Sequence, residues 1–133
     1  MKNLIARIKG SYSHIPYTWS HWKAFRKLEN ELWKNTRPDQ RWEKHYFHDW
    51  DKLVMYALIP WVGDDWIGKY HRKTRSHHPG NTIGTVDWIE AVIDWECARI
   101  TKPDKPLNAR GTLEKYYSEF RAEAEPIINM LNL

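Results

Sequence analysis

The stretch TVDWIEAVIDWECARIT, residues 85–101, decides the fold class. It is the most apolar helical pattern in the chain. Four of its apolar side chains recur at a spacing that suits the core-facing side of a helix: Val86, Ile89, Ile93 and Ile100. The stretch therefore predicts a helix that packs into the core.

Helical patterns continue on both sides of this stretch. Toward the N-terminus, the patterns predict helices over 18–35, over 39–59 up to Pro60, and over 64–76. Toward the C-terminus they predict one helix over 112–124, which Pro126 kinks or ends. The segments 76–84 and 102–111 are rich in proline and glycine, which predicts irregular structure. We find no alternating strand pattern, so we expect an all-α, compact bundle of about five helices.

The length and composition indicate one domain in a reducing compartment. A chain of 133 residues fits a single domain over 1–133, with a core over about 15–124. The chain has one cysteine, Cys97, which excludes an internal disulfide and a thiolate-rich zinc site. No stretch approaches the roughly 18 apolar residues that span a bilayer, so we expect a cytoplasmic location without membrane contact. The net charge of +4 mildly favours an anionic partner such as a phosphate ester, a nucleotide or a nucleic acid, and the dispersed positive charges give only weak support to a nucleic acid.

The segment HYFHDWDKL, residues 45–53, crowds histidines and acids next to an apolar run. On a helix, His45, His48, Asp49 and Lys52 would project to one side. Neutral imidazole and carboxylate groups suit Mn, Fe, Co, Ni, Zn or Mg. The segment therefore suggests part of a metal site, and further ligands must come from elsewhere in the chain.

The other candidate ligands follow a simple order along the chain. His21 lies on the first predicted helix, His71 on the third, and His77 and His78 lie in the following loop. Asp94 lies on the most apolar helix, where Asp87 and Glu90 share its face and are candidates for orienting ligand histidines. His14, beside a predicted loop, is the alternative to His21, and His77 is the alternative to His78.

This order resembles that of the HD phosphohydrolase superfamily, an all-helical fold named for a metal-binding His-Asp pair. His21, the pair His48-Asp49, and Asp94 match its pattern of a histidine, the pair and a final aspartate. The two-metal version adds histidines between the pair and the last aspartate, which His71 and either His77 or His78 would supply here. The resemblance implies one or two divalent ions.

A closer resemblance is to a small family of uncharacterised HD-like proteins from phages and bacteria. The chain has HWKAF at 21–25, HDWDK at 48–52, HRKTRSHH at 71–78 and DWIEAVIDW at 87–95, in that family's order. The resemblance covers most of residues 15–122, and it would place the protein in the host cytoplasm if a phage encodes it. Asp51 stands where a serine is usual.

The resemblance implies a metal-dependent phosphohydrolase that acts on a nucleotide or another phosphate ester. Metal ligands would be His21, His48, Asp49, His71, His78 and Asp94. The ion would acidify a bound water to a pKa of roughly 7, which supplies the nucleophile. Lys52, with Arg72 or Arg75, would bind the substrate and neutralise charge on its phosphate. His71 is the candidate that protonates the leaving oxygen.

Three other interpretations remain open from the sequence. The chain can be a helical binding protein that keeps the scaffold to sequester a nucleotide or to engage a protein, as a phage accessory protein that acts against host defence would. The metal can be purely structural. Without a metal, a buried Asp94 would cost about 2–5 kcal/mol unless it paired with a residue such as Arg99. Neither the substrate nor the oligomeric state follows from the sequence.

Overall fold

Six α-helices and three short 3₁₀ turns form the fold of the described residues, 3–102 and 107–133, in this computed structural model. The helices are α1 (Leu4–Asn35), α2 (Trp50–Leu58), α3 (Asp64–Thr74), α4 (Thr85–Thr101), α5 (Ala109–Tyr116) and α6 (Arg121–Met130). The 3₁₀ turns are Pro38–Gln40, Pro60–Val62 and Ser118–Phe120. No strand occurs among these described residues, so the predicted all-α class is confirmed.

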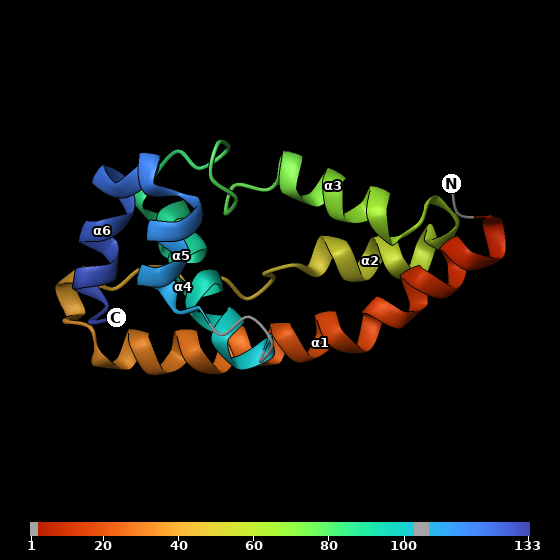
Figure 1. The fold of residues 1–133 in the computed structure, drawn as a ribbon. Coiled ribbons are helices and arrows are strands. Elements are labelled where there is room, and N and C mark those ends of the chain that lie inside the picture. Colours follow the sequence, from red (N-terminus) through yellow and green to blue (C-terminus); the bar gives the residue numbers. More distant parts are fainter. Residues whose placement is uncertain (1–2, 103–106) are drawn as a thin grey trace.

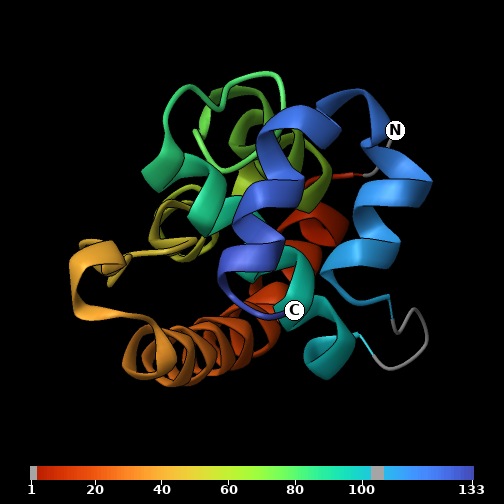
Figure 2. The ribbon, with the colours of Figure 1, turned by 90° about the vertical axis from the view of Figure 1, so that its left-hand side faces the viewer.

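Helix α1 runs along the whole molecule, and the other helices are arranged along its length (Figure 1). Its N-terminal half contacts α2 and α3, and it also contacts α4. Figure 1 shows α2 and α3 toward one end of the molecule and α5 and α6 at the other, with α4 between α1 and the C-terminal helices. Figure 2 shows α5 and α6 side by side above α1. The fold therefore has two groups of helices that share α1 as a base.

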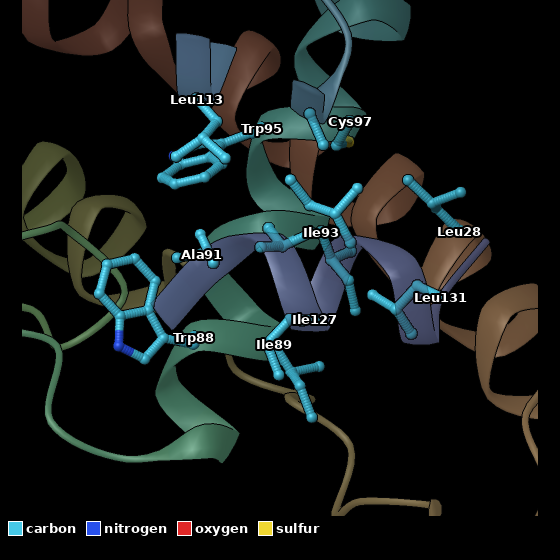
Figure 3. Packing of buried hydrophobic residues seen from close by; sticks show 14 of the residues in the cluster. Leu28, Trp88, Ile89, Ala91, Ile93, Trp95, Cys97, Leu113, Ile127 and Leu131 are labelled. Atoms are coloured by element: carbon cyan, nitrogen blue, oxygen red, sulfur yellow. The ribbon is translucent and has the colours of Figure 1, made fainter. Parts of the chain in front are cut away.

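The main hydrophobic core surrounds α4, as the sequence predicts (Figure 3). Ile89 and Ile93 are buried there against side chains of α5, α6 and the C-terminal half of α1. Val86 and Ile100, predicted on the same face, are 47% and 50% exposed because they lie near the two ends of the helix. Burial is thus confined to the central turns of α4.

The first helix begins much earlier than its prediction over 18–35. Asn3 caps it, because its side-chain oxygen accepts a hydrogen bond of 2.8 Å from the backbone N–H of Ala6. Pro16 lies inside the helix and does not end it, and Figure 1 shows the helix bending in this N-terminal half. His14, expected beside a loop, is therefore helical.

The predicted second helix over 39–59 is wrong in its first half. Residues 41–49 are irregular, and α2 begins only at Trp50. The buried carboxylate of Glu29 on α1 explains this, because it accepts hydrogen bonds from Trp42 Nε1 (3.0 Å), His45 N (2.8 Å) and His45 Nδ1 (2.6 Å). These contacts hold the segment along α1 and replace the hydrogen bonds of a helix.

The single last helix predicted over 112–124 is also wrong. Two helices, α5 and α6, meet at the turn of Ser118–Phe120, and Pro126 lies within α6. The end of the segment 102–111 is helical as well, because Asn108 caps α5 with a 2.7 Å hydrogen bond from Gly111 N. Residues 103–106 of that segment lie outside the described residues. In the part of the chain that is described, no helix is both long and apolar enough to cross a membrane.

Candidate metal centre

Four side chains predicted from the sequence converge in the interior. His21 of α1, His48 and Asp49 before α2, and Asp94 of α4 each offer one ligand atom within 4.8 Å of all the others. Asp94 Oδ1 lies 2.8 Å from His21 Nε2 and 3.0 Å from His48 Nε2. Asp49 Oδ2 lies 3.7 Å from His21 Nε2 and 3.5 Å from His48 Nε2. The predicted meeting of these residues is therefore found.

Two further histidines approach the other oxygen of Asp49. Asp49 Oδ1 lies 2.9 Å from Nε2 of His71 and 3.2 Å from Nε2 of His77. The two Nε2 atoms are 3.2 Å apart. Asp49 thus has one carboxylate oxygen toward His21 and His48 and the other toward His71 and His77.

The outward nitrogen of each of three histidines faces a carboxylate. Glu90 Oε2 lies 2.9 Å from His48 Nδ1 and 3.1 Å from His77 Nδ1. Asp51 lies 2.8 Å from His71 Nδ1. A carboxylate at Nδ1 fixes the ring and places the proton of a neutral imidazole there, which leaves a lone pair at Nε2. The sequence predicts this orienting role for Glu90, but Asp87 instead lies near the backbone N–H of Ile83, at the start of α4.

The inward Nε2 atoms therefore form a set of facing acceptors. His71 Nε2, His77 Nε2 and Asp49 Oδ1 lie within 3.2 Å of each other, and Asp49 Oδ1 is buried without a hydrogen bond. Acceptors so close repel one another unless a proton or a metal cation lies among them. Two ligands bound at about 2.1 Å to one ion lie about 3.0–3.4 Å apart, so these separations fit a metal.

His78 lies next to the second group and completes it. One of its ring nitrogens lies within 4.8 Å of ligand atoms of His71 and His77. Its Nε2 is buried and has no hydrogen-bond partner. Burial and the neighbouring His77 lower the pKa of His78 to about 3, so its ring is neutral and able to ligate a metal. His77 and His78 both belong to the cluster, whereas the sequence leaves open which of the two is a ligand.

Local backbone structure places the His-Asp pair differently from the prediction. His48 and Asp49 do not lie on a helical face, because Asp49 has a left-handed backbone (φ 61°) immediately before α2. This conformation is uncommon for a residue with a side chain and is often found at functional sites. The ring of Phe25 stacks on that of His48 with centroids 3.9 Å apart, which holds the imidazole in place.

The close approach of histidines and carboxylates shifts the pKa values of the centre. Burial alone would raise the pKa values of Asp49 and Asp94, but the adjacent histidines lower both well below the usual value. Burial alone would lower the pKa of His77, but Asp49 and Glu90 raise it to about 9. The two aspartates are therefore ionised at neutral pH, and the centre attracts protons or metal cations strongly.

A pocket of about 400 Å³ opens onto this centre. Lys52 and Arg72, two of the predicted phosphate-binding residues, line it, and Lys52 Nζ lies 3.5 Å from Asp49 Oδ2. Arg75 does not line it. It follows the last residue of α3, and its Nε lies 3.1 Å from Asp51 Oδ2. Asp51 thus contacts both His71 and Arg75.

The structure also separates two alternatives from the sequence. His21 joins the centre, whereas His14 Nδ1 bonds the Gly10 carbonyl at 2.8 Å and its Nε2 lies 3.8 Å from Asp64. Arg99 pairs with Glu96, and among the described residues Asp94 forms ion pairs with histidines and with no arginine.

Sequence reasoning missed several residues of the pocket wall. Lys102, Tyr17, Tyr116 and Tyr117 line it, from the ends of α4 and α5 and from α1. None belongs to a spacing pattern with the ligands. Only the tertiary packing of these elements brings them to the centre.

The comparisons with known proteins add no relative. No family model matches this chain, and neither the curated proteins nor the solved structures include a significant match.

Proposed function

We propose that this protein is a metal-dependent phosphohydrolase of the HD type, which acts on a nucleotide or another phosphate ester. The observation that carries the proposal is the set of facing acceptors around Asp49. The Nε2 atoms of His71 and His77 both face one carboxylate oxygen of Asp49, at 2.9 and 3.2 Å, and carboxylates hold both outward nitrogens. A divalent cation among these atoms would account for their close approach.

The residues divide into two half-sites that share Asp49. His21, His48, Asp94 and Asp49 Oδ2 would hold one ion, and His71, His77 and Asp49 Oδ1 would hold a second, with His78 beside it. Imidazole and carboxylate donors suit Mn, Fe, Co, Ni, Zn or Mg. A bound ion would polarise a phosphoryl oxygen and acidify a water molecule that serves as the nucleophile.

The chain's own cations provide the phosphate-binding part of the site. Lys52 and Arg72 line the pocket at the centre, and Lys102 lines it from the end of α4. These side chains would neutralise the charge that develops on a phosphoryl group in the transition state. His71 Nε2 is turned toward Asp49 and His77, so we give His71 the role of a ligand. Its donation of a proton to the leaving oxygen stays a prediction.

The pocket also argues against a purely structural metal. Structural sites are closed by protein ligands, whereas catalytic sites keep an open position. His21, Asp49, His71 and Asp94 all line the 400 Å³ pocket, so the centre adjoins a space in which a small molecule could bind. The same opening would serve a protein that only sequesters a nucleotide, and turnover separates that function from hydrolysis.

Metal analysis and a substrate screen test the proposal together. The protein is purified without chelator, its metal content is measured by mass spectrometry, and phosphomonoesters and phosphodiesters are assayed with each divalent ion. We expect one or two ions per chain and metal-dependent release of an alcohol from at least one ester. The variant Asp94→Asn removes a charged ligand from one half-site and is expected to lower metal content. Wild-type protein that binds none of these metals would refute the proposal.

A further inference from the structure

A second pocket of about 830 Å³ lies next to the one at the metal centre. The two pockets share one set of wall residues: Tyr17, Lys52, Gly68, Arg72 and Lys102. The ligand side chains His21, Asp49, His71, His78 and Asp94 line only the smaller pocket. The metal centre therefore lies beside the junction of a longer, continuous cleft.

The cleft extends from the centre in two directions that differ in chemistry. One part, the polar lobe, is lined by His14, Asp64, Asp65 and Lys69. The other part, the aromatic lobe, is lined by Trp95, Leu107, Tyr116 and Tyr117. Asp64 to Lys69 belong to α3 and Tyr116 to α5, and Figure 1 shows these helices on opposite sides of the molecule.

We infer that the substrate is a phosphodiester with two unlike ester groups, one in each lobe. This inference rests on the proposed function. A phosphomonoester has one substituent and would fill one lobe only. The aromatic lobe suits a planar, weakly polar group that stacks on tyrosine and tryptophan rings. The polar lobe suits a group with hydroxyls, because carboxylate and imidazole side chains accept hydrogen bonds from them.

The junction between the lobes carries the cations that a phosphodiester needs at its centre. Lys52, Arg72 and Lys102 line both pockets, so the positive side chains are shared by the two lobes. A bridging phosphate at this place has the metal ligands on one side and the cations around it. The two ester groups then leave the phosphate in opposite directions.

The missing side chain of Gly68 is a further observation in favour of a substrate that extends through both lobes. Gly68 lies within α3, where glycine costs about 1 kcal/mol relative to alanine. It also lies at the junction of the two pockets. An added Cβ would meet only the end of the Arg72 side chain, at 3.3 Å, so helix packing does not require glycine here. The missing side chain keeps the passage between the lobes wide.

The chemistry is a simple hydrolysis. Water attacks phosphorus, a new P–O bond forms, and one of the two ester P–O bonds breaks. The leaving oxygen takes the proton that the water loses, so the products are a phosphomonoester and an alcohol. No oxidant, reductant or further reactant is needed.

Three chromogenic substrates with the same leaving group test the preference. They are thymidine 5′-(4-nitrophenyl phosphate), bis(4-nitrophenyl) phosphate and 4-nitrophenyl phosphate, each assayed with the metal-loaded protein. We expect the thymidine diester, with one planar and one hydroxyl-bearing arm, to exceed both others in kcat/KM by about tenfold or more. Equal values for the two diesters, or a preference for the monoester, would overturn the inference.

Binding without turnover provides a second measurement. Calorimetry compares thymidine 5′-phenylphosphonate with thymidine 5′-methylphosphonate, which lacks only the planar arm. Filling the aromatic lobe should tighten binding about tenfold or more. Equal affinities would show that this lobe does not receive the second arm.

Substitution at the junction tests the role of Gly68. In Gly68→Leu, kcat/KM for the thymidine diester should fall about tenfold more than kcat/KM for the monoester, because the added side chain narrows the passage. Lys73→Leu, on the same helix but outside both pockets, is the matched control. Circular dichroism checks the fold of each variant. If Gly68→Leu does not fold, Gly68→Ala replaces it, with a smaller effect in the same direction.

The outcomes separate this inference from the proposed function. Turnover with the monoester preferred, and no gain from the phenyl arm, would leave a phosphohydrolase and refute the two-armed substrate. No turnover, with a clear gain from the phenyl arm, would refute hydrolysis and leave a binding site for two-armed phosphodiesters. Absence of both would refute both.

Discussion

Lys52 lies where a side chain can act on a substrate without holding the metal. Its Nζ is 3.5 Å from Asp49 Oδ2, and it lines both pockets. We expect Lys52→Ala to keep its metal and lose about 100- to 1000-fold in turnover, or about 2.7–4 kcal/mol of transition-state stabilisation. Metal analysis and kinetics on the same samples check this, with the exposed Lys73→Ala as control. Full turnover in Lys52→Ala would contradict the role of this lysine.

Glu90 is the residue on which two ligand histidines depend. Its carboxylate faces the Nδ1 atoms of His48 and His77, at 2.9 and 3.1 Å. Glu90→Gln removes the charge that fixes both rings, and losses of this kind lower metal affinity about 10- to 100-fold. Competition with a chromogenic chelator measures the affinity.

Asp87→Asn is the matched control for Glu90→Gln. Asp87 lies on the same helix, one turn earlier, and its carboxylate lies near only the backbone N–H of Ile83. Its metal affinity should equal that of the wild type. If Glu90→Gln also binds metal as tightly as the wild type does, packing alone holds the rings of His48 and His77.

At the scale of single elements, two glycines inside helices, Gly10 and Gly68, differ in what an added side chain would contact. A Cβ on Gly10 of α1 would collide with the side chain of Asp64, because the start of α3 packs closely against α1. A Cβ on Gly68 would meet only the flexible end of Arg72. We expect Gly10→Ala to lower the free energy of unfolding and Gly68→Ala to raise it, by up to about 1 kcal/mol. Urea denaturation of both variants checks the signs, and a stabilising Gly10→Ala would contradict the close packing.

Element boundaries show where sequence reasoning succeeds and where it fails. Residues 85–101 are helical as predicted, because their apolar pattern and their burial agree. Proline is a weak guide to helix ends here, since Pro16 lies inside α1 and Pro126 lies inside α6. A local sequence pattern also does not reveal a hydrogen bond between a side chain and a backbone group far along the chain. Glu29 holds His45 across 16 positions and thereby prevents a helix before Trp50.

The ligand residues of the candidate site were predicted better than the boundaries of the helices on which they lie. The order of His21, His48, Asp49 and Asp94 is enough to suggest their meeting, although His48 and Asp49 reach it from a turn and not from a helix. The walls of the cleft were not predictable, because Tyr17, Lys102 and Tyr117 meet only through tertiary packing.

At the scale of the whole molecule, the stability of the fold depends on whether His77 holds a proton or ligates a metal ion. The folded state raises the pKa of His77 from 6.5 to about 9, so it binds more protons than the unfolded chain between these values. Protonated His77 therefore stabilises chelated protein fully below about pH 6.5, and this stabilisation is lost as the pH rises toward 9. Thermal melts of chelated protein should show the midpoint falling across this range.

Metal should reverse this pH dependence. Metal ligation requires deprotonated Nε2 atoms, so affinity rises with pH, and an ion at 100 times its dissociation constant adds about 2.7 kcal/mol of stability. Melts with Mn²⁺ or Zn²⁺ should therefore lie above those of chelated protein by more at pH 9 than at pH 6.5. Identical melts with and without these ions at both pH values would contradict a metal centre at His77.

The separation of the ligands along the chain has a consequence for how the protein is made. The contact between His21 and Asp94 joins residues 73 positions apart, and that between His48 and Asp94 spans 46. A ribosome has therefore synthesised α1, α2 and α3 before the residue that completes the first half-site exists. His71 and His77 meet Asp49 earlier in synthesis, within 28 positions of it. The order of translation therefore makes the ligand residues of the second half-site available before the last ligand of the first, Asp94, has been synthesised.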